Sequence, residues 1–181
     1  MTFLNIIFVG LTILYPFVVY LSLGRLEPRV LALILLIVYG TRFLIGRRTS
    51  PTYAAWMFFA VASFVVVVFA QGSATTLYYY PVVINIILFV LFGYSLAYPP
   101  TVIEKIARLQ EPDLAPSGVA YTRKVTFVWL IFFVVNGSIA LTTAIHGDVA
   151  LWSLYNGLIA YLLMGVVFLA EFLVRRQVRG K

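Results

Sequence analysis

Three asparagines, Asn85, Asn136 and Asn156, lie inside long apolar runs and are the residues best placed to hold a polar ligand. An amide in an apolar environment needs hydrogen-bond partners, either on a neighbouring helix or on a bound molecule. The first case makes the three residues interhelical contacts. The second makes them a polar pocket for a lipid headgroup or a polar substrate, with Trp129 and Tyr155 beside them in the same runs.

Two groups of basic residues are suited to bind anions. Arg25 and Arg29 belong to a short turn between two apolar runs, where they either hold a phosphate or carboxylate or simply solvate the turn. The second group lies in the polar segment 99–125. It would bind anionic lipid or a phosphorylated headgroup, or would retain the segment on one side of a membrane. Its members are Lys105, Arg108, Arg123 and Lys124.

Proton chemistry has one main candidate, because Glu171 is the only acidic residue within an apolar run. Arg175 follows one turn later, so we expect an ion pair at the membrane interface, with proton coupling as the alternative. The sequence has no cysteine and one histidine, which excludes thiolate and histidine metal clusters. It also lacks hydrolase, metalloprotease, P-loop and dinucleotide-binding motifs. We therefore expect no metal, no cofactor and no enzymatic activity.

Composition predicts the elements that position these residues. Hydrophobic residues make up 63% of the 181 positions and charged residues 10%, against about 45–50% and 25% in a soluble domain. The sequence therefore predicts one all-α domain over residues 1–181, a polytopic membrane helix bundle with six transmembrane helices. The first contains Tyr15-Pro16, so it either crosses the membrane or is re-entrant. The spans are expected at about 3–23, 29–45, 53–70, 77–98, 126–145 and 150–173.

The basic residues predict how these spans are oriented. Six alternating spans place Arg25 and Arg29 on one side and the other 11 of the 13 lysines and arginines on the opposite side. Because basic residues are retained in the cytoplasm, both termini and the segment 99–125 should be cytoplasmic, in the inner membrane of a bacterium. Topology and anionic headgroups account for the net charge of +7, so no nucleic-acid partner is expected.

The polar segment predicts a short amphipathic helix over 101–110, lying in the cytoplasmic membrane interface. Thr101 and Glu104 fit a capping box, in which a threonine begins a helix and a glutamate three residues later supports it. Pro112 and Pro116 are expected to end this helix before the next span. Its apolar side is formed by Val102, Ile103, Ile106, Ala107 and Leu109, and its polar side by Glu104, Lys105 and Arg108.

Two stretches of the chain resemble each other. The run 52–59 opens one predicted span and the run 126–133 opens another, and each contains a threonine, a tryptophan and a Phe-Phe pair. Each span is followed by a short turn with a glycine, Gly72 or Gly147, and then by an aromatic-rich span. This pattern predicts two tandem hairpins as a parallel repeat, with chance similarity as the alternative. A functional site would then lie between the hairpins.

The order of these features resembles the intracellular septation protein A family of bacterial inner-membrane proteins. The resemblance covers most of the chain, and its most distinctive part is Lys124-x-Thr126-x-x-Trp129-x-x-Phe132-Phe133. The connector 99–126 is longer than in that family and is closer to a sister group of membrane proteins. That group resembles products of bacterial clusters for aryl-polyene or related lipid-linked polyketides. The resemblance implies a role in envelope biogenesis and no catalytic residues.

Three functions fit these observations. The first is a non-enzymatic envelope-biogenesis protein that binds or translocates a lipid or lipid-linked product, with membrane lipids as partners. The second is a structural or interaction module that organises cell-envelope or division enzymes, which would show an exposed helix face of small residues. The third is a small proton-coupled transporter, which would need Glu171 or Asp148 to be buried and accessible. The oligomeric state is left open, and a dimer is compatible with the sequence.

Overall fold

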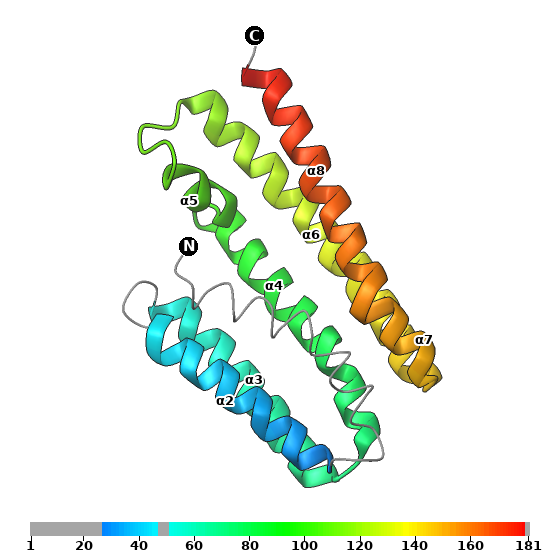
Figure 1. Cartoon of the computed structure of the whole chain (residues 1–181). Coiled ribbons are helices and arrows are strands. Elements are labelled where there is room, and N and C mark those ends of the chain that lie inside the picture. The colour runs from blue at the N-terminus through cyan, green and yellow to red at the C-terminus, as the bar shows by residue number, and fades with distance from the viewer. Residues whose placement is uncertain (1–26, 47–50, 180–181) are drawn as a thin grey trace. The chain divides into compact units, whose positions relative to one another are not determined.

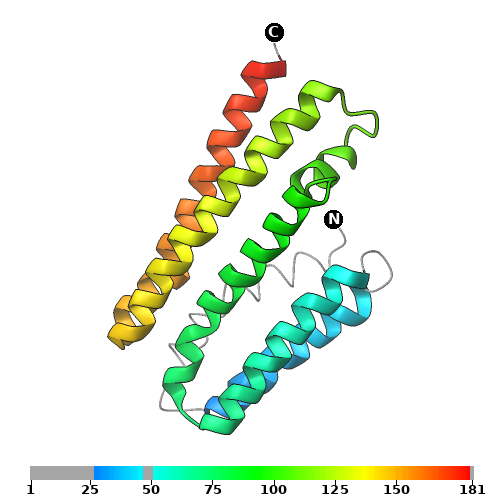
Figure 2. The same cartoon turned by 180° about the vertical axis from the view of Figure 1, so that it is seen from behind.

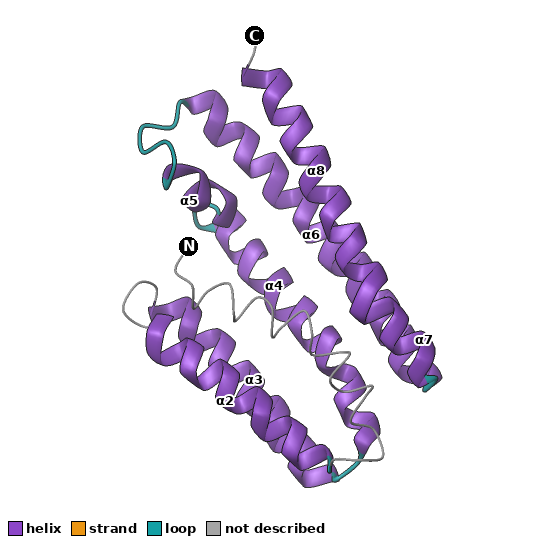
Figure 3. Ribbon diagram, viewed as in Figure 1, coloured by secondary structure: helices purple, strands orange, loops and turns teal. Residues whose placement is uncertain are grey.

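The structure of the chain is a computed structural model that describes residues 27–46 and 51–179. All regular structure in these residues is helical (Figure 3), which confirms the predicted all-α class. The expected first span, 3–23, lies outside the described residues, and so does Arg25. The helices labelled in Figure 1 are α2 (Pro28–Gly46), α3 (Pro51–Gln71), α4 (Tyr80–Ala97), α5 (Val102–Arg108), α6 (Pro116–His146), α7 (Val149–Leu154) and α8 (Ala160–Arg179).

Two shorter segments complete the helical structure. A 3₁₀ segment, η1 (Ala74–Tyr79), leads into α4, and a π-helical turn, η2 (Tyr155–Ile159), joins α7 to α8. Among the described residues, three helical stretches are long and apolar enough to cross a membrane. They identify the chain as a membrane protein by length and composition. These stretches are Thr75–Ala97, Pro116–His146 and Val149–Arg176.

The chain forms two compact units, and each is described by itself. The first unit contains the residues up to Val83 together with those from Ala140 onward. Within it, α2 and α3 lie side by side as a hairpin (Figures 1 and 2). Phe43 stacks on Phe58 across this hairpin, with ring centroids 5.1 Å apart.

The second unit is Ile84–Ile139, in which α4 and the first part of α6 pack against each other in opposite directions. Contacts show the direction, because Phe92 meets Phe133 with ring centroids 5.0 Å apart, whereas Asn85, nearer the start of α4, meets Asn136, nearer the end of α6. The α5 helix and the connector complete this unit.

Helix α6 begins ten residues earlier than the sequence analysis predicts. We expected Pro116 to end the connector helix and a span to begin near 126, but Pro116 is the first residue of a helix of 31 residues. A proline fits the first turn of a helix, because its φ is already helical and its missing N–H would have no partner there. The early start makes Tyr121, Arg123 and Lys124 part of the helix.

The two reversals Gly72-Ser73 and Gly147-Asp148 are built alike. Both glycines have positive φ, 64° and 76°, and each donates its N–H to the carbonyl four residues earlier, on Val68 or Thr143. The next residue in each case caps the following helical segment. The Ser73 hydroxyl accepts from the Thr75 N–H at 3.3 Å, and the Asp148 carboxylate accepts from two N–H groups at 2.8 and 3.0 Å.

The last expected span, 150–173, is helical but not continuous. At Tyr155–Ile159 the backbone widens into a π-helical turn, in which the Ala160 N–H donates to the Tyr155 carbonyl five residues earlier. Three of its five residues, Tyr155, Asn156 and Gly157, are buried. The turn therefore lies where polar and small residues of this helix face the protein interior.

Candidate functional site

The centre of the second unit holds a buried pair of amides. Asn136 Nδ2 donates to Asn85 Oδ1 at 3.1 Å, and both side chains are 7% exposed. The flanking residues on α4 and α6 are apolar, so the two amides satisfy each other where water is scarce. Of the three asparagines that the sequence singles out, the structure therefore pairs Asn85 with Asn136.

Glycine at position 137 allows this pair to form. A Cβ atom built on Gly137 would lie 3.0 Å from the Cβ of Asn85 and 3.6 Å from its Cγ. Side-chain atoms rarely approach so closely, so the two helices meet at this point because α6 has no side chain there. Small residues serve this purpose in membrane helix pairs.

Asn156, the third asparagine, has its own partners within the first unit. Its Nδ2 donates to Thr143 Oγ1 at 3.2 Å and to the Trp152 carbonyl at 2.9 Å. Asn156 is 4% exposed and Thr143 is 6% exposed. The hydrogen bond joins the end of α6 to the π-helical turn and is buried.

The aromatic residues near these amides are also buried. Trp129 is 4% exposed on α6, where its ring lies 5.7 Å from that of Phe133, and Tyr155 is 7% exposed at the start of the π-helical turn. Trp152 is fully buried, and its Nε1–H donates to the Tyr78 carbonyl at 2.9 Å while its ring packs on that of Tyr78. This contact joins η1 to α7, the helical segments that follow the reversals at Gly72 and Gly147.

One face of α6 carries buried residues from Thr122 to Thr143. The spacing alternates between four and three residues, so these positions form one stripe along the helix. Four of the seven are polar, and α6 is the most buried of the three long apolar stretches. The members of this α6 stripe are Thr122, Thr126, Trp129, Phe133, Asn136, Ala140 and Thr143.

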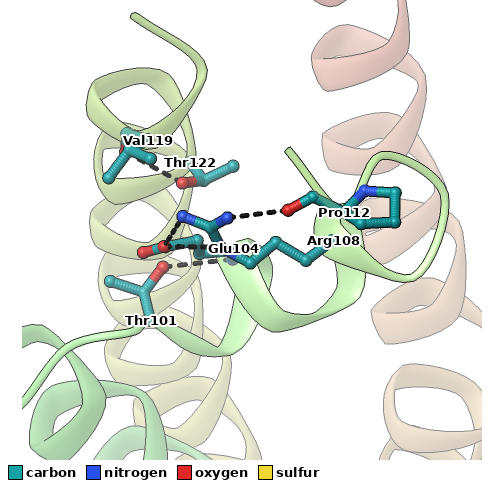
Figure 4. Close-up of polar contacts among 6 residues, drawn as sticks. All are labelled: Thr101, Glu104, Arg108, Pro112, Val119 and Thr122. Carbon is teal, nitrogen blue, oxygen red and sulfur yellow. Dashed lines mark hydrogen bonds and ion pairs between the residues drawn. The ribbon is translucent and has the colours of Figure 1, made fainter. Parts of the chain in front are cut away.

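The connector is tied to the end of α4 and to itself. Thr101 is the N-cap of α5, as predicted, and its hydroxyl accepts from the Glu104 N–H at 3.2 Å. The fully buried Ser95 hydroxyl accepts from the Val102 N–H at 3.1 Å. Arg108 lies between the Glu104 carboxylate and the Pro112 carbonyl (Figure 4), with Nε and Nη2 at 3.0 and 2.9 Å from Glu104 Oε1. Its Nη1 lies 2.9 Å from the Pro112 oxygen.

The faces of α5 differ from the predicted amphipathic pattern. Glu104, expected on the polar side, is 5% exposed, whereas Ile106 and Leu109 are 54% and 84% exposed. Arg108 offsets the charge of the inward carboxylate. A membrane interface, where the helix is predicted to lie, would accept the outward Ile106 and Leu109 side chains.

Replacing Arg108 should loosen the connector. An Arg108→Met variant leaves the buried Glu104 carboxylate without its cation and the Pro112 carbonyl without its donor. Hydrogen bonds to charged groups contribute about 1.5–3 kcal/mol. Because the Arg108 side chain is 39% exposed, we expect a loss of about 1–2 kcal/mol, with faster hydrogen exchange over 109–115. The exposed Arg123→Met is the matched control, and equal effects of the two changes would contradict this account.

The remaining predicted binding residues lie at the surface. Arg29 is exposed, and its Nη2 is 3.5 Å from the point where a Cβ on Gly72 would lie. Lys105, Arg123 and Lys124 are exposed as well, whereas Arg108 is engaged within the connector. Headgroup binding by these residues stays a prediction.

The expected ion pair at the end of the last helix is present. Arg175 Nε lies 3.5 Å from Glu171 Oε1. Arg175 and Arg176 also lie over the ring of Phe172, at 6.0 and 5.7 Å from its centroid. Asp148, the other candidate acid for proton coupling, is exposed and caps α7.

Several buried hydroxyl residues lie on the same helical segments as Asn136 and Asn156 and were not among the predicted site residues. Thr122, Thr126 and Thr143 belong to the α6 stripe, and Ser153 is buried one turn before Asn156. A signal for the threonines exists, because they recur with Asn136 at spacings that place them on one helix face. Asn156 lies in the π-helical turn, for which the sequence has no established signal.

Comparison of the chain with protein-family models, with curated proteins and with solved structures finds no match in any of the three.

Proposed function

We propose that this chain is a non-enzymatic protein of the bacterial inner membrane that binds or translocates a lipid or a lipid-linked product. The observation that carries the proposal is the α6 stripe, in which Thr122, Thr126, Asn136 and Thr143 are buried at successive depths of one long apolar helix. Polar residues inside a membrane are costly, and they often mark the path or site of a polar group.

The proposal includes a topology of six spans with both termini in the cytoplasm, the first span either crossing or re-entrant. This topology is supported by helices α2 and α3, which coincide with the expected spans 29–45 and 53–70, and by the three longer apolar stretches, which overlap the other three expected spans. The similar reversals at Gly72 and Gly147 support the proposed repeat of two hairpins. On this topology, the connector and the exposed Lys105, Arg123 and Lys124 face the cytoplasmic leaflet, where anionic lipids are found.

The amide pair provides a test of the proposal. Asn136→Leu alone removes the hydrogen bond that Asn136 Nδ2 donates to Asn85 Oδ1, and we expect a loss of about 1–2 kcal/mol. The double variant Asn85→Leu/Asn136→Leu replaces both partners with apolar groups of similar shape, so most of the stability should return. If the amides serve a ligand, the double variant should still retain less lipid than the wild-type protein. Melting temperature and mass spectrometry of co-purified lipid measure the two effects.

A different result would remove the support of the amide pair. If the double variant regains both stability and lipid content, the amides are interhelical contacts. An Asn156→Ala variant extends the test to the π-helical turn, where the Thr143 hydroxyl would lose its donor. Complementation of a strain that lacks the protein gives a second measure of function for the same variants.

An interaction module is the second candidate, and one observation favours it. Gly165 lies on the exposed part of α8, and a Cβ built there would have no heavy atom within 4 Å. Another helix can approach closely at such a position. Large apolar side chains surround it, including the exposed Leu162 and Val166, so the face is not made of small residues as a packing module would predict. Loss of self-association in a Gly165→Leu variant would favour this candidate.

A further inference from the structure

Among the described residues, Ser153 has the one fully buried side-chain oxygen that lacks a hydrogen-bond partner. It is 6% exposed, and its Oγ has no hydrogen-bond partner within the described part of the chain. Serine and threonine in a helix usually donate to a carbonyl three or four residues earlier. Ser63 does so to the Phe59 carbonyl at 2.8 Å, and Thr126 to the Thr122 carbonyl at 2.8 Å. A buried hydroxyl without such a bond is unfavourable unless a ligand supplies a hydrogen-bond partner.

A second polar atom lies on the same side of the helix. Asn156 follows Ser153 by three residues, and residues three apart share a helix face. Both hydrogen bonds of the Asn156 side chain use its Nδ2, so its Oδ1 is available to accept. Asn156 lies within the π-helical turn that begins at Tyr155, and Ser153 lies two residues before this turn. Such turns are frequent at functional sites.

The cluster formed by Ser153, Asn156, Thr143 and Trp152 is suited to a neutral ligand group. Ser153 Oγ can donate and accept, and Asn156 Oδ1 can accept. The other members, Thr143 and Trp152, are also uncharged. The nearby acid Asp148 is exposed, and its carboxylate accepts from two N–H groups of α7. None of these described residues carries a positive charge that would favour a phosphate, whereas a hydroxyl group has the donor and acceptor that Ser153 Oγ and Asn156 Oδ1 require.

We propose that Ser153 Oγ and Asn156 Oδ1 form a binding site for the hydroxyl of a neutral headgroup, such as the sugar of a glycolipid. This inference rests on the proposed lipid-binding function and names the headgroup class and the atoms that recognise it. On the predicted topology, the site lies at the outer end of the last hairpin, close to the Gly147 reversal. The same chemistry would accept a free sugar, so the experiment distinguishes the two sources.

The test measures binding by the purified full-length protein in lauryldimethylamine oxide, a detergent without hydroxyl groups. Monogalactosyl diacylglycerol should raise the melting temperature of the wild-type protein, whereas phosphatidic acid should have little effect. Galactose is the free-sugar probe. A shift with the galactolipid alone assigns a lipid ligand, and a Ser153-dependent shift with galactose assigns the sugar itself.

The informative variant is Ser153→Ala, with Ser63→Ala as the matched control. Without ligand, Ser153→Ala should melt at the same temperature as the wild-type protein or higher, because it removes a buried hydroxyl that has no partner within the described part of the chain. Its affinity for the galactolipid should fall at least tenfold, whereas Ser63→Ala should bind as the wild-type protein does.

Three binding results would overturn the assignment. They are no binding of either sugar probe by the wild-type protein, unchanged affinity in Ser153→Ala, and stronger binding of phosphatidic acid than of the galactolipid. A lower melting temperature of ligand-free Ser153→Ala would also overturn it, since the hydroxyl would then have a protein partner. If the amide-pair variants still lose lipid, the proposed function stands and only this site is rejected.

Discussion

Trp152→Ala is expected to destabilise the protein severely. Trp152 is fully buried, its indole N–H donates to the Tyr78 carbonyl at 2.9 Å, and its ring lies 5.2 Å from that of Tyr78. Removing a buried aromatic ring costs about 3–5 kcal/mol, and the Tyr78 carbonyl loses its donor as well. We expect a lower melting temperature in detergent, measured by fluorescence-detected size-exclusion chromatography of a fusion protein.

Trp152→Phe separates the ring from the hydrogen bond. The phenyl ring keeps most of the contact with Tyr78 but cannot donate, so this variant should lose only about 1 kcal/mol. If both variants have the melting temperature of the wild-type protein, the contact between η1 and α7 contributes nothing to stability. If Phe is as damaging as Ala, the hydrogen bond rather than the packing is the main contribution.

Gly137→Leu is expected to force α4 and α6 apart. A Cβ at this position would already lie 3.0 Å from Asn85 Cβ, and the rest of a leucine side chain has to fit in the same region. Overpacking of this kind typically costs about 1–3 kcal/mol. Separation of the helices also breaks the hydrogen bond between Asn85 and Asn136, which contributes about 1 kcal/mol more. The expected result is a large drop in melting temperature.

Gly165→Leu is the matched control for this change. It makes the same substitution on a long apolar helix, at a position where a Cβ meets no atom within 4 Å. Leucine is a better helix former than glycine by about 0.5–1 kcal/mol, so this variant should melt at the same temperature as the wild-type protein or higher. Similar losses in the two variants would show that leucine is damaging for another reason than the contact with Asn85.

Composition and local signals predicted much of the fold. The apolar content predicts membrane helices, and the described residues contain three long apolar helices. Thr101 begins α5, and Glu171 pairs with Arg175, because capping and i,i+4 pairing depend only on residues close in sequence. The Gly72 and Gly147 turns were predicted for the same reason.

What could not be predicted depends on residues far apart or on several competing choices. Pairing of Asn85 with Asn136 requires the register of two helices, which a single sequence does not define. Pro116 is compatible with both the end of one helix and the beginning of the next, and the second use prevails. The inward position of Glu104 depends on Arg108 and on what surrounds α5. At these positions the structure provides information that the sequence alone does not contain.

The reversals at Gly72 and Gly147 have a consequence for how the chain assembles during synthesis. The glycine N–H bond and the cap at each reversal involve residues no more than four positions apart, so each reversal can close without any later part of the chain. The contact between Tyr78 and Trp152 spans 74 residues. It can form only after Trp152 has left the ribosome, since chains fold from the N-terminus during synthesis. Local signals therefore shape each reversal first, and the aromatic contact joins η1 to α7 afterwards.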